Sequence, residues 1–156
     1  MAEPSPSRPA PADVHALIAR IDESWREFLA ACDGIPEERG NEPGVVGDWS
    51  LTNLYGHIGF WDQQAIHDAE SALAGRPNAN DDWQELNDAD HAARHGRTLP
   101  EERTAMHQAH AALIAHLEGV SHLDAGALDD AIKASSYGHY EEHIPDIAGW
   151  RERSGV

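Results

Sequence analysis

Hydrophobic residues recur every three or four positions along most of this chain, which is the spacing of an amphipathic α-helix. A first helix is predicted to end near Gly34, with Pro36 just beyond it. A second is predicted to start after Ser50, a favourable N-cap, and to stop at residues 75–77; Asn53 stands where a capping box would have Glu or Gln. The predicted inward positions are Val14, Leu17, Ile18, Ile21, Trp25, Phe28, Leu29, Cys32, then Leu51, Leu54, Tyr55, Ile58, Trp61, Ala65, Ala69 and Leu73.

The second half of the chain predicts a short helix and two long ones. The short helix covers Trp83 to Arg97, and Pro100 in a first-turn position opens the third long helix. The last long helix runs from about Ser135 to Arg153. Because Pro145 removes a backbone donor, this helix either kinks after residue 143 or ends there, with a new helix starting at the proline. The apolar positions of the short helix are Trp83, Leu86 and Ala89, and those of the third long helix are Met106, Ala109, Leu113, Leu117 and Val120.

These elements predict an all-α protein, a four-helix bundle with a short extra helix in the connection between the second and third long helices. The chain has 156 residues, which is the size of one domain, and we expect that domain to span residues 13–156. Residues 1–12 hold four prolines among Ser and Ala without an apolar period, so a disordered N-terminal arm is expected there.

Charge and cysteine content narrow the class of function. The chain has 11 Lys and Arg against 28 Asp and Glu, a formal charge of −17, which disfavours nucleic acids and anionic membrane surfaces as partners. A single cysteine, Cys32, excludes an internal disulfide, and its place in the first apolar stripe indicates a core residue rather than a nucleophile. The sequence has no long apolar stretch that would indicate a membrane span or a secretory signal, so we expect a soluble cytoplasmic protein.

Three histidines carry the main chemical hypothesis. His139 and His143 are spaced i and i+4, which places them on one face of a helix, and His57 lies beside the apolar stripe of the second helix, one turn before Trp61. A pair on one helix and a single histidine on a neighbour can bind one metal ion. A buried histidine that is hydrogen-bonded to a neighbouring helix is the alternative interpretation of His57.

Other histidines compete for this interpretation. With 11 histidines in 156 residues, about 0.8 pairs are expected by chance at any chosen offset. A second i, i+4 pair, His91 and His95, lies among acidic and arginine residues, which is typical of a solvated helix face. His107, His110 and His116 are mostly off the apolar stripe of the third long helix, so they are expected to be solvated or partly packed rather than ligands.

The order of motifs resembles the DinB/YfiT-like superfamily over about residues 13 to 153. The resemblance lies in the early Trp25 and Phe28, the Gly-Asp-Trp-Ser sequence before the second helix, the histidine one turn before Trp61, and the final Gly-His-Tyr-Glu-Glu-His. It implies a four-helix bundle with a three-histidine metal site between the second and fourth helices, and the matching positions are His57, His139 and His143. Homodimers are common in the family, so a homodimer is expected.

The resemblance implies several chemistries. The family includes bacillithiol- and mycothiol-dependent transferases, the maleylpyruvate isomerase domain, colibactin-type self-resistance hydrolases and members without an assigned role. The isomerase has a glutamate where His139 stands here, which weakens that assignment. The expected function is therefore a metal-dependent transferase that uses a low-molecular-weight thiol, or a hydrolase, acting on an electrophilic or toxic small molecule. The alternative is a non-catalytic protein that binds or sequesters such a molecule.

Three neutral imidazoles leave a divalent ion with its full charge and an open coordination position. Zn²⁺ is the first candidate, and Ni²⁺ or Fe²⁺ are the alternatives. Trp61, Tyr140 and Trp150 are predicted to line the mouth of the substrate or cofactor pocket, with packing in the core as the alternative. Of the two glutamates between the helical histidines, Glu141 is expected to be solvated, because helical geometry directs it away from the pair.

Overall fold

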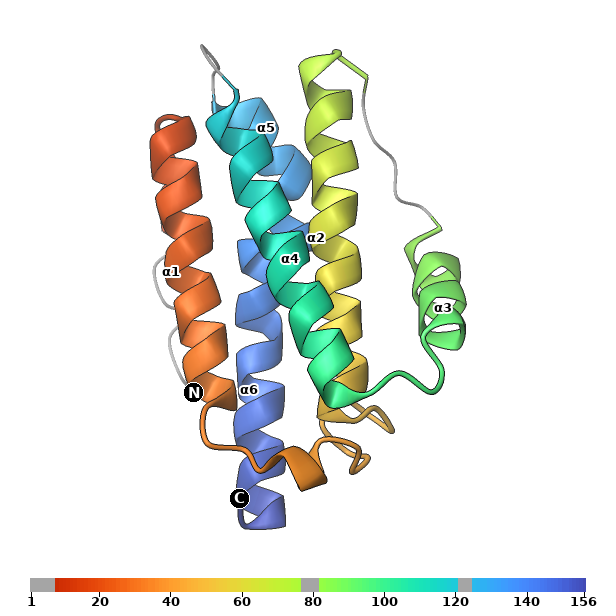
Figure 1. Cartoon of the computed structure of the whole chain (residues 1–156). Coiled ribbons are helices and arrows are strands. Elements are labelled where there is room, and N and C mark those ends of the chain that lie inside the picture. Colours follow the sequence, from red (N-terminus) through yellow and green to blue (C-terminus); the bar gives the residue numbers. More distant parts are fainter. Residues whose placement is uncertain (1–7, 77–81, 121–124) are drawn as a thin grey trace.

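The computed structural model describes residues 8–76, 82–120 and 125–156. Within these ranges, helices are joined by turns and loops, and the β structure is limited to an isolated bridge between Val46 and Trp49. Short 3₁₀ turns occur at Glu37–Arg39 and Lys133–Ser135. The predicted all-α bundle is confirmed (Figure 1). Its α-helices are α1 (Val14–Cys32), α2 (Leu51–Leu73), α3 (Trp83–Ala93), α4 (Leu99–Glu118), α5 (Ala125–Ile132) and α6 (Tyr137–Ser154).

The four long helices enclose one hydrophobic core. Helix α2 packs most extensively on α4, α1 packs on α6, and the short α5 packs on α2. The short α3 stands beside the bundle on the side of α2 (Figure 1), and none of its residues is buried. None of the described helices is long and apolar enough to cross a membrane. Among the fully buried core residues are Leu17, Ile21, Phe28, Leu54, Ile58, Met106, Leu113, Leu117, Ile132, Tyr140 and Ile147.

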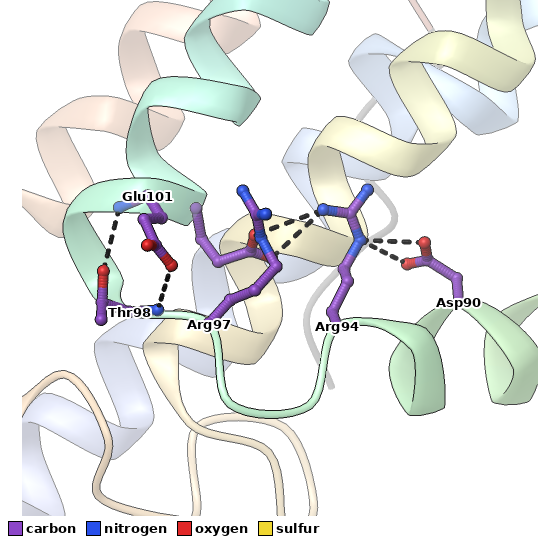
Figure 2. Close-up of polar contacts among 6 residues, drawn as sticks. Asp90, Arg94, Arg97, Thr98 and Glu101 are labelled. Carbon is purple, nitrogen blue, oxygen red and sulfur yellow. Dashed lines mark hydrogen bonds and ion pairs between the residues drawn. The ribbon is translucent and has the colours of Figure 1, made fainter.

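Side-chain caps begin the two helices that pack together most closely. Ser50 caps α2, and the Asn53 side chain accepts a hydrogen bond from the Ser50 backbone N–H at 2.9 Å, so a full capping box forms although position 53 holds neither Glu nor Gln. The amide oxygen of Asn53 does what a carboxylate oxygen does in the usual motif. Thr98 and Glu101 form a second capping box at α4 (Figure 2).

Helix α6 continues through Pro145 without a break, so the predicted alternative of two separate helices is wrong. A proline leaves the carbonyl four residues earlier without its helical partner, here that of Glu141. Both Pro145 and Glu141 are exposed, so water can satisfy this carbonyl. The helix then ends at Gly155, whose φ of 68° is the left-handed geometry typical of a helix terminus.

Three other details differ from the sequence predictions or extend them. Helix α5 was not predicted, because eight residues are too short to show a helical period. Leu73 is 42% exposed although the α2 stripe predicts it inward, because it is the last residue of that helix. The predicted disordered arm lies mostly outside the described residues; within them, Arg8 forms an ion pair with Glu23 of α1 at 2.6 Å.

Candidate metal centre

His57 of α2 and His139 and His143 of α6 meet inside the bundle, and these three residues are called the three-histidine cluster below. One ring nitrogen of each lies within 4.8 Å of the other two. His139 Nε2 is 2.8 Å from His57 Nε2 and 3.1 Å from His143 Nε2. All three side chains are buried, with exposed fractions between 6% and 9%. The structure therefore brings together the three residues that the sequence indicated.

The proton balance of the cluster fits a cation at its centre. His143 Nδ1 lies 2.9 Å from Asp146 Oδ2, so Nδ1 carries the proton and His143 Nε2 presents a lone pair. If His139 Nε2 carries a proton, that proton can point at only one of its two imidazole neighbours; if it carries none, its lone pair faces the lone pair of His143 Nε2. In both cases one of the two short N–N contacts lacks a hydrogen bond. A metal ion shared by the three Nε2 atoms removes this conflict. Two ligands of a tetrahedral zinc stand about 3.3 Å apart, slightly farther than the 2.8 Å and 3.1 Å separations here.

Burial keeps His57 and His139 in the neutral form that metal binding requires. Burial, followed by repulsion from His143 and His91, lowers the pKa of His57 to about 3. Burial and repulsion from the other two histidines hold the pKa of His139 well below its ordinary value. His57 and His139 are therefore uncharged near neutral pH, and each of these two rings keeps one nitrogen lone pair for a metal ion.

Outer contacts hold two of the three rings. Asp146, one turn after His143, fixes the tautomer of that ring, as carboxylates beside metal-ligating histidines usually do. The Trp49 ring stands edge-on to His57, with ring centroids 4.8 Å apart. The exposed His91 ring stacks on Trp49, with ring centroids 5.1 Å apart. His139 Nδ1 is buried and has no hydrogen-bond partner among the described residues.

A cavity of about 500 Å³ opens directly onto the cluster, and all three histidines line it. This volume lies within the range of small-molecule sites. On one side, small residues of α5 and of the 3₁₀ turn after it, Ala131, Ala134 and Ser135, leave room. The remaining walls, called the site cavity walls below, are mainly aromatic and amide side chains: Trp49, Trp61, Trp83, Gln84, Asn87 and Glu142.

Helix α3 covers part of the cavity without entering the core. Trp61 Nε1 donates a hydrogen bond to Asn87 Oδ1 at 2.7 Å, which joins α2 to α3 beside the histidines. Trp83, the first residue of α3, is 53% exposed and lines the cavity. The cover is therefore tied to the bundle by specific polar contacts rather than by buried apolar surface.

Ion pairs fasten the other end of α3. Arg94 lies between Asp90 and Glu102, at 2.9 Å and 3.3 Å, and Arg97 also contacts Glu102 (Figure 2). Glu102 is almost fully buried against α2 at Gly56, where an added Cβ would overlap its carboxylate. Gly56 thus lets the α3–α4 connection dock one residue before His57.

Two predicted lining residues lie elsewhere. Trp61 lines the cavity as expected, whereas Tyr140 and Trp150 are in the hydrophobic core and do not line it. The reason is helical geometry: Tyr140 follows His139 and is rotated by about 100° from it, toward the rings of Trp25 and Phe28 on α1.

The other histidines and glutamates are placed as follows. His110 is buried, contrary to the expectation of a solvated or partly packed side chain, and lies 3.1 Å from the Tyr140 hydroxyl. His107 is exposed. Glu141 is exposed and accepts a hydrogen bond from Ser24, whereas Glu142 is exposed and lines the cavity.

Sequence reasoning missed Trp49, Asn87 and Asp146 as parts of the site. Asp146 is three residues after His143, so i, i+3 spacing on one helix face was a usable signal. The loop residue Trp49 and the α3 residue Asn87 gave no such signal, because their positions depend on how a loop and a short helix fold back over α2.

Comparisons with known proteins agree with the fold. The sequence model of the DinB superfamily matches residues 20–150. Among solved structures, an uncharacterised protein from Escherichia coli UTI89 is 11% identical, with a TM-score of 0.77 over 94% of this chain and 97% of that one. A protein from Streptococcus pneumoniae is 12% identical, with a TM-score of 0.70 over 94% and 93%. Such identities show a shared fold alone. No curated protein matches this chain.

Proposed function

This chain belongs to the DinB superfamily, and from that premise we propose that it is a metal-dependent enzyme acting on an electrophilic small molecule, by thiol transfer or by hydrolysis. The observation that carries the proposal is the meeting of three buried Nε2 atoms at the wall of a cavity large enough for a substrate. His57, His139 and His143 would hold the ion, with Zn²⁺ as the first candidate and Ni²⁺ or Fe²⁺ as alternatives.

The ion and the protein side chains would have different roles in the reaction. A bound divalent ion supplies Lewis acidity, which lowers the pKa of a thiol or of water, or polarises a carbonyl. Asp146 keeps the His143 ring oriented, and burial keeps His57 and His139 neutral. Glu142 lines the cavity and would accept a proton from the attacking group.

In the transferase version, the sulfur of a low-molecular-weight thiol forms a bond to the electrophilic carbon, and the leaving group departs with its electron pair. The thiol proton passes to Glu142 and then to solvent. In the hydrolase version, the oxygen of water forms the new bond, and the proton follows the same route. Cys32 takes no part, because it is buried in the core and burial raises the pKa of its thiol to about 11.

One observation favours the alternative, a protein that sequesters its ligand without turning it over. Apart from the histidines, Glu142 is the one ionisable side chain among the described residues that line the cavity. A cavity with so few acid–base groups is also suited to holding a molecule unchanged.

A reconstitution experiment tests the proposal. The purified protein is stripped of metal, loaded with Zn²⁺, Ni²⁺ or Fe²⁺, and assayed with 1-chloro-2,4-dinitrobenzene plus a thiol and with an activated ester. We expect uptake of one ion per chain and turnover that is lost in His57→Ala and retained in Cys32→Ala. Uptake without turnover of either substrate favours sequestration. Failure to bind any of the three ions contradicts a metal-dependent function.

A further inference from the structure

The walls of the site cavity hold an arrangement of charge that the metal chemistry does not explain. Among the described lining residues there is no Lys or Arg, and the one charged side chain besides the histidines is the carboxylate of Glu142. Three tryptophans, Trp49, Trp61 and Trp83, supply aromatic faces from three separate segments, namely the loop before α2, α2 itself and α3. An aromatic face attracts cations and planar apolar groups.

Nearby basic side chains do not compensate for this acidity. Arg94 lines a narrow adjoining cleft rather than the main cavity, and it is held between Asp90 and Glu102 (Figure 2). Arg97 is also paired with Glu102. Lys133 lies between two lining alanines in sequence, but it is exposed and does not line the cavity. An anionic ligand would therefore find no free cationic partner on the cavity walls described above.

The cover adds further negative charge. Helix α3 carries Glu85 and Asp88, besides the Asp90 that is paired with Arg94, and it has no Lys or Arg; the formal charge of the chain is −17. A cleft surrounded by one sign of charge concentrates ligands of the opposite sign and repels those of its own. The three-histidine cluster forms the floor of the cavity. A cation bound there would have the opposite effect and attract a single electron-rich atom of the ligand.

We infer that this cavity selects small organic molecules with an aromatic or apolar body that is uncharged or cationic, and that it rejects anionic bodies. The tryptophans bind the body, and Glu142 attracts a positive group on it. The selection deepens the proposed function by naming the class of substrate or thiol. Only the contact between the ligand and the three-histidine cluster depends on the proposed function. The selection by the walls does not depend on it, because the walls act whether or not an ion is bound.

Binding to the metal-free full-length protein tests this selection. Three probes of similar size are compared by titration calorimetry at low salt: phenyltrimethylammonium, benzyl alcohol and benzenesulfonate. None of the three is a strong metal ligand. We expect the cation to bind more tightly than the sulfonate by about tenfold or more, with the alcohol between them. Trp83→Ala should weaken the binding of all three, and because Trp83 is exposed the variant should fold.

Charge variants on neighbouring residues locate the effect. Glu142→Gln should reduce the preference for the cation, and Glu142→Lys should reverse it. Glu141→Lys is the matched control, because it changes the net charge equally but its carboxylate bonds to Ser24 and does not line the cavity. We expect Glu141→Lys to keep the wild-type order of the probes.

Three results would overturn the inference: equal or tighter binding of the sulfonate, the same reversal in Glu141→Lys as in Glu142→Lys, or no binding of any probe. These results are distinct from failure of the proposed function. A protein that takes up no metal and turns nothing over can still prefer the cation, which would leave the selection standing. A metal-loaded, active protein that prefers the sulfonate would refute the selection alone.

Discussion

Helix α6 presents two buried polar clusters to its neighbours, and the two use histidine in opposite ways. In the three-histidine cluster, His139 Nε2 faces two other imidazole nitrogens, and its Nδ1 has no partner among the described residues. One residue later, the Tyr140 hydroxyl begins a second cluster, called the tyrosine network here, which consists of Asp22, Asp62, His110 and Tyr140.

In the tyrosine network, each ring nitrogen of His110 faces an oxygen. Nδ1 lies 3.1 Å from the Tyr140 hydroxyl, which donates to Asp62 at 2.5 Å, and Nε2 lies 3.2 Å from Asp22. The ring is stacked on Trp25 at 4.1 Å. Burial raises the pKa of Asp62 well above its ordinary value and lowers that of His110, so the network avoids buried charge.

The difference between the clusters is instructive. A buried histidine whose nitrogens face oxygens is a structural element that links helices, here α1, α4, α6 and α2. Where histidine nitrogens face one another beside a cavity, the protein itself does not supply a partner for each of them. Burial alone separates the two cases poorly, because His110 and His139 are 7% and 6% exposed.

The largest expected effect separates the clusters by metal affinity. His139→Ala removes the nitrogen that lies between the other two and should weaken metal binding by at least about 100-fold. This figure is the upper end of the loss seen when a residue that only hydrogen-bonds to a metal ligand is removed. His110→Ala should leave the affinity unchanged. Competition titration with a zinc chelator measures both. Equal loss of metal affinity in His139→Ala and His110→Ala would contradict a metal-binding role that is specific to the three-histidine cluster.

The next prediction concerns the free energy of unfolding rather than metal affinity. Tyr140→Phe removes the hydroxyl between Asp62 and His110 and leaves both without that partner, so the free energy of unfolding should fall by about 1–3 kcal/mol. Metal affinity should not change, because Tyr140 does not line the cavity. Urea unfolding of the metal-free protein measures the stability. A variant that unfolds like the wild type but binds metal weakly would assign Tyr140 to the site instead.

A smaller effect sharpens the role of the outer contact. Asp146→Asn keeps a hydrogen-bond acceptor beside His143 but removes the carboxylate charge, so metal affinity should fall by about tenfold. Asp130→Asn, at an exposed acidic residue of α5, is the matched control for the change in net charge. A fall of the same size in the control would mean that the general field of the protein, and not the contact with His143, sets the affinity.

The helical period explains why much of the site was predictable. His57 lies beside an apolar stripe, and His139 and His143 are one turn apart, so both faces follow from 3.6 residues per turn. The same period could not say which neighbour each face meets. For this reason Tyr140 and Trp150 were assigned to the pocket mouth but lie in the core, while Trp49 was overlooked.

The remaining errors arise where packing outweighs local pattern. His110 lies off the apolar stripe of α4, yet it is buried because Asp22, Trp25 and Tyr140 from other helices surround it. Pro145 disfavours a helix by local rules, yet α6 continues. Glu141 and Pro145 are exposed, so water can satisfy the freed carbonyl, and Ile144 and Ile147 pack in or against the core.

The most direct test of the central claim is X-ray absorption spectroscopy at the zinc edge on the protein loaded with one equivalent of Zn²⁺. Three imidazoles on one ion predict a first shell of nitrogen or oxygen at about 2.0–2.1 Å, with outer-shell scattering from imidazole rings that decreases in His139→Ala. A sulfur shell at about 2.3 Å, which would implicate Cys32, or a spectrum without imidazole scattering would contradict the claim.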